Sequence, residues 1–252
     1  MEAIYDQIGS GYTVTRCTDP KIQDQIKNEL NSATNIINIG AGTGSYEPKN
    51  VNLVAVEPSL EMISQRNENS YPVKQAKADQ LPFPDNYFSH AMTVLSMHHW
   101  ENRIQAFSEI KRVTTKKFVA VTWLPEAAPF WLTRDYFPEI HEIHEIDCRI
   151  FPSTSELKKS FRNLEVKPLL IPEDCKNGFL ACFWKRPEAY LQKNVRTAIS
   201  TFSKIKNLEL GLKKLESDLS TGEWHKRNAN LLDKSHIDVG YRIITIDLSM
   251  NA

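Results

Sequence analysis

Short apolar runs alternate with helical patterns along the first half of the chain, and this alternation constrains the fold more than any other feature. Five runs have the composition and length of strands: residues 35–40, 51–58, 71–78, 87–97 and 117–125. Most of them are continuously apolar instead of alternating with polar residues, which is typical of strands that are buried on both faces. Strands that alternate with helices predict an α/β protein, in which helices cover both faces of a parallel sheet.

Two helices are predicted between these runs. Residues 59–68 begin with Ser59, a residue type that caps helix N-termini. Residues 101–113 place apolar side chains at a spacing of three, which forms one buried stripe on a helix: Ile104, Phe107, Ile110 and Val113. Each segment is long enough to cross over from one parallel strand to the next.

The second half of the chain has a different texture. Residues 125–153 are rich in aromatic residues and interrupted by prolines, and residues 164–172 have the composition of one more strand. Residues 187–232 are mostly helical in pattern, and residues 240–248 close the chain as a strand. A helical insertion is therefore predicted between the last two strands.

These patterns predict a division into two parts. Residues 1–172 and 237–252 form the sheet domain, and residues 173–236 form the helical insertion. The insertion either caps a ligand site or only packs against the sheet domain, and the sequence leaves both open.

Three glycines follow the first predicted strand. Gly40, Gly42 and Gly44 would place the backbone against a ligand at the carboxyl edge of the sheet. The dinucleotide fingerprint G-x-G-x-x-G requires its third glycine one residue later, and Pro48 shortens or delays any following helix. The lysine and hydroxyl residue of a P-loop are also missing, so a ligand without a phosphate at this turn is favoured.

Two acids follow the next two strands. Glu57 ends the second strand, where a carboxylate can accept hydrogen bonds from the two hydroxyls of a ribose. Asp79 follows the third strand and could accept from an adenine amine, while the Gln80 amide donates to a ring nitrogen and Leu81 and Phe83 form an apolar wall. A solvated Glu57 and a turn-capping Asp79 are the alternatives. Together with the glycine turn, the two acids predict an adenosine site.

At this level the sequence resembles a known family. The motifs "IINIGAGTG", "VAVEPSLEMISQR", "ADQLPFPDNYFSHAMTVLSMHHW" and "AFSEIKRV" are similar to those of class I S-adenosylmethionine-dependent methyltransferases of the small-molecule type called type 11. The resemblance implies a Rossmann-like sheet of seven mostly parallel strands whose last strand, residues 240–248, runs antiparallel. It also implies S-adenosyl-L-methionine as cofactor. The residues that it places at the cofactor are Gly40, Ala41, Gly42, Thr43, Gly44, Glu57, Pro58, Asp79, Gln80, Leu81, Leu95 and Ser96.

The chain departs from the family pattern at two places. Asn38 stands two residues before the first glycine, where the family usually carries an acid, so this position brings no charge. Residues 114–117, "TTKK", replace a Pro-Gly-Gly turn that is common before the fifth strand. The second departure is expected to be structural only.

The candidates for the chemistry lie past the strand ends. Methyl transfer from a sulfonium is an in-line displacement that needs alignment and exclusion of water, and a base helps if the acceptor is a hydroxyl or an amine. His98 and His99 follow the fourth strand and are candidates for this base, or cap the next helix. The N-terminal Tyr12 and Arg16 could cover the cofactor and pair with its carboxylate.

Aromatic residues follow the fifth predicted strand, where such enzymes bind the acceptor. They form acceptor walls or hydrophobic core: Trp123, Phe130 and Trp131. Further along, His141 and His144 lie three apart among acids, and a solvated helix face is expected there instead of a metal site.

Composition excludes several classes of function. Lys plus Arg and Asp plus Glu both number 31, so no overall charge attracts nucleic acid or a membrane surface. The four cysteines show no zinc spacing or disulfide framework, and no segment has the length of a signal or membrane span. We therefore expect a soluble, cytoplasmic methyltransferase for a small-molecule acceptor, such as one of secondary or antibiotic-type metabolism. The alternatives are a catalytically weak adenosine-binding module of the same fold and a nicotinamide-dependent oxidoreductase.

Overall fold

A seven-stranded sheet forms the centre of the molecule. The computed structural model describes residues 17–124, 130–140 and 150–249, so Tyr12, Arg16 and the 141–149 segment lie outside the described residues. The strands follow the order β3-β2-β1-β4-β5-β9-β6 across the sheet. Their bounds are Asn35–Ile39 (β1), Asn52–Glu57 (β2), Val73–Gln75 (β3), Phe88–Val94 (β4), Thr114–Trp123 (β5), Leu164–Pro168 (β6) and Tyr241–Asp247 (β9).

The direction of the strands agrees with the prediction. Strands β1 to β5 pair in parallel, whereas β9 is antiparallel to both of its neighbours, β5 and β6. The expected α/β class and the antiparallel last strand are therefore confirmed.

Three helices pack on the sheet next to the strands that precede or follow them. Helix α3 (Pro20–Glu29) is capped by Asp19, which accepts from the amides of Lys21 and Ile22 at 2.9 and 3.1 Å. Helix α4 (Leu60–Ser64) is capped by Ser59, as the sequence predicts, and α5 (Arg103–Val113) is capped by Asn102. Helix α3 was not predicted, because its mostly polar segment has few apolar positions.

The two faces of the sheet bury separate cores. Because successive side chains of a strand point to opposite faces, Ile36 joins one core and its neighbour Ile37 joins the other. Helix α5 and helix α8 (Thr154–Ser160) cover the second face through Phe107, Ile110 and Leu157. Helix α3 covers the first face together with residues of the helical insertion.

Two strand boundaries differ from the prediction. Strand β5 begins at Thr114, directly where α5 ends, so residues 114–117 lie in the strand and not in a turn before it. The predicted strand 164–172 is divided into β6 and β7 (Ile171–Pro172), because the partner strand β9 begins at Tyr241 and offers no further residues for pairing. Strand β7 pairs instead with β8 (His236–Ile237) in a separate two-stranded sheet.

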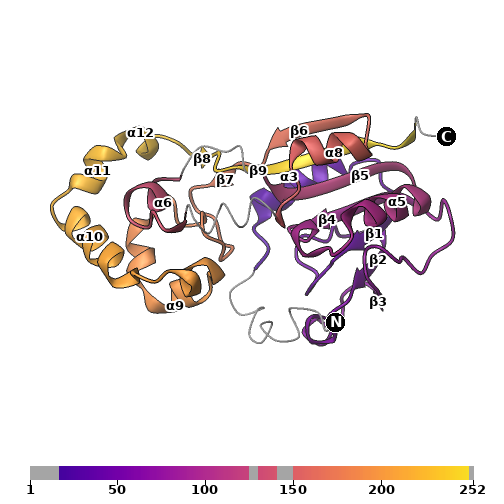
Figure 1. The fold of residues 1–252 in the computed structure, drawn as a ribbon, viewed down its shortest axis with the longest axis horizontal. Coiled ribbons are helices and arrows are strands. Elements are labelled where there is room, and N and C mark those ends of the chain that lie inside the picture. Colours follow the sequence, from indigo (N-terminus) through magenta and orange to yellow (C-terminus); the bar gives the residue numbers. More distant parts are fainter. Residues whose placement is uncertain (1–16, 125–129, 141–149, 250–252) are drawn as a thin grey trace.

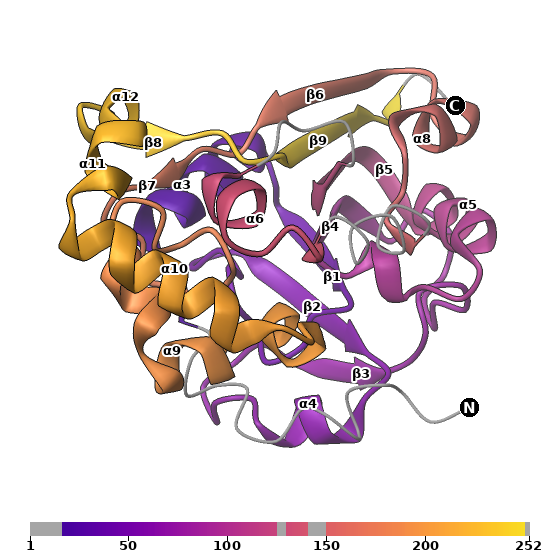
Figure 2. The ribbon, with the colours of Figure 1, turned by 60° about the vertical axis from the view of Figure 1, so that its left-hand side comes forward.

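The helices between β7 and β8 gather in one group beside the sheet, away from α5 and α8 (Figures 1 and 2). They are η2 (Pro187–Leu191), α9 (Lys193–Thr197), η3 (Ser200–Lys204), α10 (Leu208–Ser220), α11 (Glu223–Arg227) and α12 (Ala229–Leu232). Helix α6 (Trp131–Asp135), which follows β5, lies among them (Figure 1). We call this group, from η2 to α12 together with α6, the helical part.

The strand register places the helical part at the functional edge of the sheet. Trp123, at the carboxyl end of β5, pairs with Tyr241 at the start of β9, and Pro168 at the end of β6 pairs with Arg242. The chain therefore leaves the sheet and returns to it at the edge where the parallel strands end. Ligands of open α/β sheets bind at this edge.

Candidate cofactor and acceptor site

The glycine turn after β1 has a backbone that depends on glycine. Gly40, Gly42 and Gly44 have φ angles of 67°, 52° and 92°, in the left-handed region. The amides of Gly40 and Ala41 donate to the Val56 carbonyl at 2.8 and 3.0 Å, which holds the turn against the end of β2. The turn is thus shaped so that its backbone faces outward at the carboxyl edge.

Glu57 lies beside this turn at the end of β2. Its side chain is buried, and its Oε2 accepts from the Gly42 amide at 2.8 Å while its Oε1 accepts from the Ser59 amide at 2.9 Å. These two amides fix the carboxylate in place. Since a carboxylate oxygen accepts more than one hydrogen bond, a pair of ribose hydroxyls can still be accepted there.

Asn38 fits the amino-acid end of the cofactor. It is 2% exposed, and its Nδ2 donates to Glu47 Oε1 at 3.0 Å. This bond orients the amide, so that Oδ1 is an acceptor facing away from Glu47. Oδ1 has no hydrogen-bond partner among the described residues. A buried acceptor of this kind favours a donor such as an ammonium group.

The end of β4 is strained. Leu95 has a φ of 50°, which is uncommon for a residue with a branched side chain, and its amide donates to the Val121 carbonyl at 2.8 Å. Strain of this kind concentrates at functional sites. Next to it, Ser96 Oγ accepts from Trp100 Nε1 at 3.1 Å and faces Gly40, where an added Cβ would lie 1.8 Å from this oxygen.

The loop after β3 places Asp79 half-buried in a turn, with Leu81 buried behind it. One part of the prediction changes here: the Gln80 amide donates to the Lys77 carbonyl at 3.2 Å, so in this structure it serves the turn and not an adenine nitrogen. The Leu81 amide donates to Glu109 Oε2 at 2.8 Å. Hydrogen bonds from the Arg112 guanidinium lower the pKa of Glu109, which keeps this anchor charged.

His98 and His99 form a short turn of 3-10 helix, η1 (Met97–His99), directly after β4. The His98 ring stacks on Phe151 with centroids 4.3 Å apart, and Phe151 meets Trp123 edge-on at 5.6 Å. Burial lowers the pKa of His98 to about 3, so its imidazole is neutral near pH 7. Its Nδ1 is buried and has no hydrogen-bond partner among the described residues.

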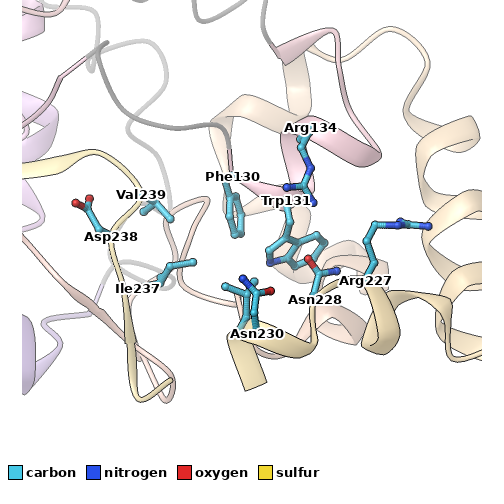
Figure 3. Close-up of a pocket in the computed structure, with 10 residues that line it drawn as sticks. Phe130, Trp131, Arg134, Arg227, Asn228, Asn230, Ile237, Asp238 and Val239 are labelled. Carbon is cyan, nitrogen blue, oxygen red and sulfur yellow. The ribbon is translucent and has the colours of Figure 1, made fainter. Parts of the chain in front are cut away.

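The predicted acceptor residues divide into two places. Trp123, half-buried at the end of β5, donates from Nε1 to the Val239 carbonyl at 3.3 Å. Phe130 and Trp131 instead line a pocket of about 250 Å³ between the helical part and residues 237–239, together with Arg134, Asn228 and others (Figure 3). Val239 also lines this pocket, so Trp123 lies behind its wall but does not line it.

Trp131 is at the same time a core residue. It is 3% exposed, its Nε1 donates to the Trp184 carbonyl at 2.9 Å, and its ring meets Tyr190 and Trp224 edge-on at 5.8 and 5.2 Å. Most of its surface therefore packs other aromatic rings.

Three residues of the site were not predicted from the sequence, and each contacts residues from another segment of the chain. Phe151 gave no signal beyond an aromatic-rich segment. Glu47 and Arg66 form a buried ion pair behind the glycine turn, with Nη2 and Oε2 2.9 Å apart. Arg66 lies in the predicted helical segment 59–68, but nothing in the sequence paired it with Glu47.

Comparisons with known proteins identify the family and the fold. Residues 37–119 match the family model of a methyltransferase domain. A solved structure from Anabaena variabilis, described as that of a candidate methyltransferase from an antibiotic biosynthesis pathway, is 32% identical, covers 92% of this chain and 98% of its own, and superposes with a TM-score of 0.80. The YcgJ protein of Bacillus subtilis, 17% identical over 90% of this chain and 97% of its own with a TM-score of 0.51, shares the fold.

A curated relative is more distant. The tRNA (carboxymethyluridine(34)-5-O)-methyltransferase of Schizosaccharomyces pombe is 25% identical over 121 residues, which are 46% of this chain. The chain spans about half of that relative's length (53%).

The identity and coverage of the Anabaena protein show the family: the chain belongs to the class I S-adenosylmethionine-dependent methyltransferases. It is an enzyme of this class, and S-adenosylmethionine is its methyl donor. The family sets aside the nicotinamide-dependent oxidoreductase. Among the described residues no helix is long and apolar enough to cross a membrane, and no three potential metal ligands gather.

Proposed function

We propose that the protein methylates a small-molecule acceptor that binds between the carboxyl edge of the sheet and the helical part. The observation that carries this proposal is the position of the helical part. The chain leaves the sheet after β5 and after β6 to form the helical part, and it returns to the sheet at the start of β9. All three positions lie at the edge of the sheet that carries the glycine turn. A site bounded on both sides suits an acceptor that is small enough to be surrounded.

The cofactor would lie along the ends of β1, β2 and β4. In this proposal the glycine turn faces the methionine part, Glu57 accepts from the ribose hydroxyls, and Asp79 accepts from the adenine amine. Asn38 Oδ1 accepts from the ammonium group, directly or through a water. Contacts in the structure support two of these roles: Glu57 is fixed by two backbone amides, and Asn38 is oriented by Glu47.

The bound cofactor supplies an activated methyl group and its own leaving group. The residues of this chain then have to align the acceptor and exclude water. Leu95, held in a strained conformation at the end of β4, would border the reacting centre, and Trp123 and Phe151 would close it with apolar surface. Such alignment is the main protein contribution to a displacement reaction.

His98 is proposed to accept a hydrogen bond from the acceptor. Because its pKa is lowered to about 3, His98 is a weak base in this conformation, but its neutral ring can orient a hydroxyl or amine by accepting a hydrogen bond. His99 beside it remains the second candidate, and because burial lowers its pKa to about 4 it too would act as a neutral hydrogen-bond acceptor.

A tRNA acceptor is less well supported than a small molecule. The chain has 31 basic and 31 acidic residues, whereas nucleic-acid binding depends on an excess of positive charge at the interface. The likeness to the tRNA methyltransferase covers less than half of this chain. A role in antibiotic-type metabolism and a cytoplasmic location stay predictions.

The cofactor site is tested by calorimetry with S-adenosylhomocysteine. Wild type should bind it, and Glu57→Ala should weaken binding about tenfold or more, which corresponds to about 1.4 kcal/mol. Unchanged affinity in this variant would place the ribose elsewhere.

The acceptor class is tested with S-adenosylmethionine that carries an isotopic label in its methyl group. The enzyme is incubated with a cell extract that has been divided by filtration into a macromolecular fraction containing tRNA and a small-molecule fraction. Label should enter the small-molecule fraction only. Label in tRNA would contradict the proposal, and binding without transfer to either fraction would support the catalytically weak binding module.

A further inference from the structure

A buried ion pair lies behind the glycine turn. Arg66 Nη2 is 2.9 Å from both carboxylate oxygens of Glu47, and the two side chains are only 4% and 6% exposed. Removing two charges from water is costly, and a buried pair often gives no more stability than apolar residues of the same size. A contribution to stability therefore does not by itself explain why these two residues stand here.

The ion pair is connected to the turn through one residue, Gly42. Arg66 Nη1 donates to the Gly42 carbonyl at 3.2 Å, and the Gly42 amide donates to Glu57 Oε2 at 2.8 Å. The residue at the centre of the turn is thus held from one side by the guanidinium and from the other by the proposed ribose carboxylate. A Cβ added to Gly44 would lie 3.1 Å from both Arg66 Nη1 and Glu47 Oε2, so the pair also packs closely against the end of the turn.

The same pair reaches the amino-acid end of the site. Glu47 Oε1 accepts from Asn38 Nδ2 at 3.0 Å, and this bond decides which way the Asn38 amide faces. Asn38 itself carries no charge. A carboxylate is nevertheless present beside it, contributed by Glu47 from the far side of the turn.

We propose that Arg66 and Glu47 are positioning residues for S-adenosylmethionine: their ion pair holds Gly42 and Asn38 in the orientations that the cofactor requires. Neither residue contacts the cofactor. This inference depends on the proposed placement of the cofactor at the glycine turn.

The first test compares the cofactor affinity of two variants that are expected to lose similar amounts of stability. Arg66→Lys keeps the charge but loses the fork that reaches both Glu47 and Gly42. Its control is Ile246→Ala. Ile246 lies in the core on the α5 side of the sheet, toward the end of β9 that is far from the glycine turn. Both are measured for melting temperature and, well below it, for affinity to S-adenosylhomocysteine by calorimetry.

A positioning role predicts that Arg66→Lys weakens binding about tenfold, while Ile246→Ala changes it less than about twofold at a similar fall in melting temperature. The inference is overturned if Arg66→Lys binds within about twofold of wild type, or no more weakly than Ile246→Ala. Glu57→Ala is measured alongside. If that variant alone leaves affinity unchanged while Arg66→Lys weakens it, the assignment of the ribose to Glu57 fails and not the role of the ion pair.

The second test exchanges an amide and a carboxylate. Asn38→Asp places two carboxylates where an amide now donates to Glu47 at 3.0 Å, so it should weaken binding by like-charge repulsion. Adding Glu47→Gln restores one amide and one carboxylate at this contact, with the negative charge moved from position 47 to position 38. The double variant should bind more tightly than Asn38→Asp alone, by about tenfold. If the affinity losses of Asn38→Asp and Glu47→Gln simply add up in the double variant, the proposed coupling between residues 38 and 47 is wrong.

Discussion

Gly40→Ala is expected to damage both the fold and the cofactor site, and its cost can be worked out from two separate causes. Gly40 has a φ of 67°, and an L-residue in this left-handed region costs about 1–2 kcal/mol. The new Cβ would also lie 1.8 Å from Ser96 Oγ and 2.7 Å from Ser96 Cβ, far inside contact distance. Ser96 cannot turn away freely, because its Oγ accepts from Trp100 Nε1.

The sum of these effects should exceed about 3 kcal/mol, since overpacking alone costs about 1–3 kcal/mol and the lost hydrogen bond about 1 kcal/mol. For a chain of 252 residues this corresponds to a fall of about 6–12 °C in melting temperature. The control is Gly222→Ala: Gly222 has a φ of 79°, and nothing lies within 4 Å of its added Cβ. This variant isolates the backbone strain and should lose only about 1–2 kcal/mol.

Thermal unfolding and calorimetry with S-adenosylhomocysteine are the assays. Ser96→Gly removes both atoms that the new Cβ would meet, so the pair Gly40→Ala with Ser96→Gly should regain part of the stability that Gly40→Ala loses. The reasoning is wrong if Gly40→Ala is no less stable than Gly222→Ala, or if Ser96→Gly gives no recovery.

Three further predictions follow from burial. His90 is fully buried in β4, and burial lowers its pKa to about 4, so it binds a proton in the unfolded chain more readily than in the folded one. The contribution of His90 to the free energy of unfolding should therefore be complete above pH 6.5 and fall between pH 6.5 and 4, by up to about 3 kcal/mol. When the free energy of unfolding is measured with urea at a series of pH values, His90→Gln should reduce this fall. Trp131→Ala should cost about 3–5 kcal/mol in urea unfolding because it empties the centre of the helical part, and near-normal stability would show that the ring serves the pocket alone. Because the pKa of His98 lies near 3, the pH–rate profile should have no inflection from this residue between pH 5 and 7, and an inflection that disappears in His98→Gln would contradict its neutral role.

Much of the sheet could be predicted because parallel strands that are buried on both faces leave an unbroken apolar signal. The runs at β1, β2 and β4 are of this kind, and the Ser59 cap marked α4 correctly. Helix α3 was missed because only Ile22 and Ile26 are buried on it. The division between β6 and β7 could not be predicted, since it depends on where β9 begins.

The candidate site, like the fold, could be predicted only in part from the sequence. The glycine turn and Glu57 follow directly from the ends of their strands, and the structure brings them together as the sequence predicts. Contacts made by side chains from distant segments gave no signal. Glu47 and Arg66 are 19 residues apart and meet only because the turn folds back on α4. The Gln80 amide was assigned to a ligand although the local turn already uses it.

The two-stranded β7–β8 ribbon makes the helical part look like a removable insert, because Ile171 and Ile237 are paired neighbours and a short turn could join them. The packing shows the opposite. One continuous core contains Ile36 and Val119 from the sheet as well as Tyr190 and Leu215 from the helical part. Shortening the chain at the ribbon would therefore strip one face of the sheet of its cover. We expect the whole chain to unfold in a single cooperative transition, so that any sequence change that reshapes the acceptor side must also preserve the stability of the cofactor side.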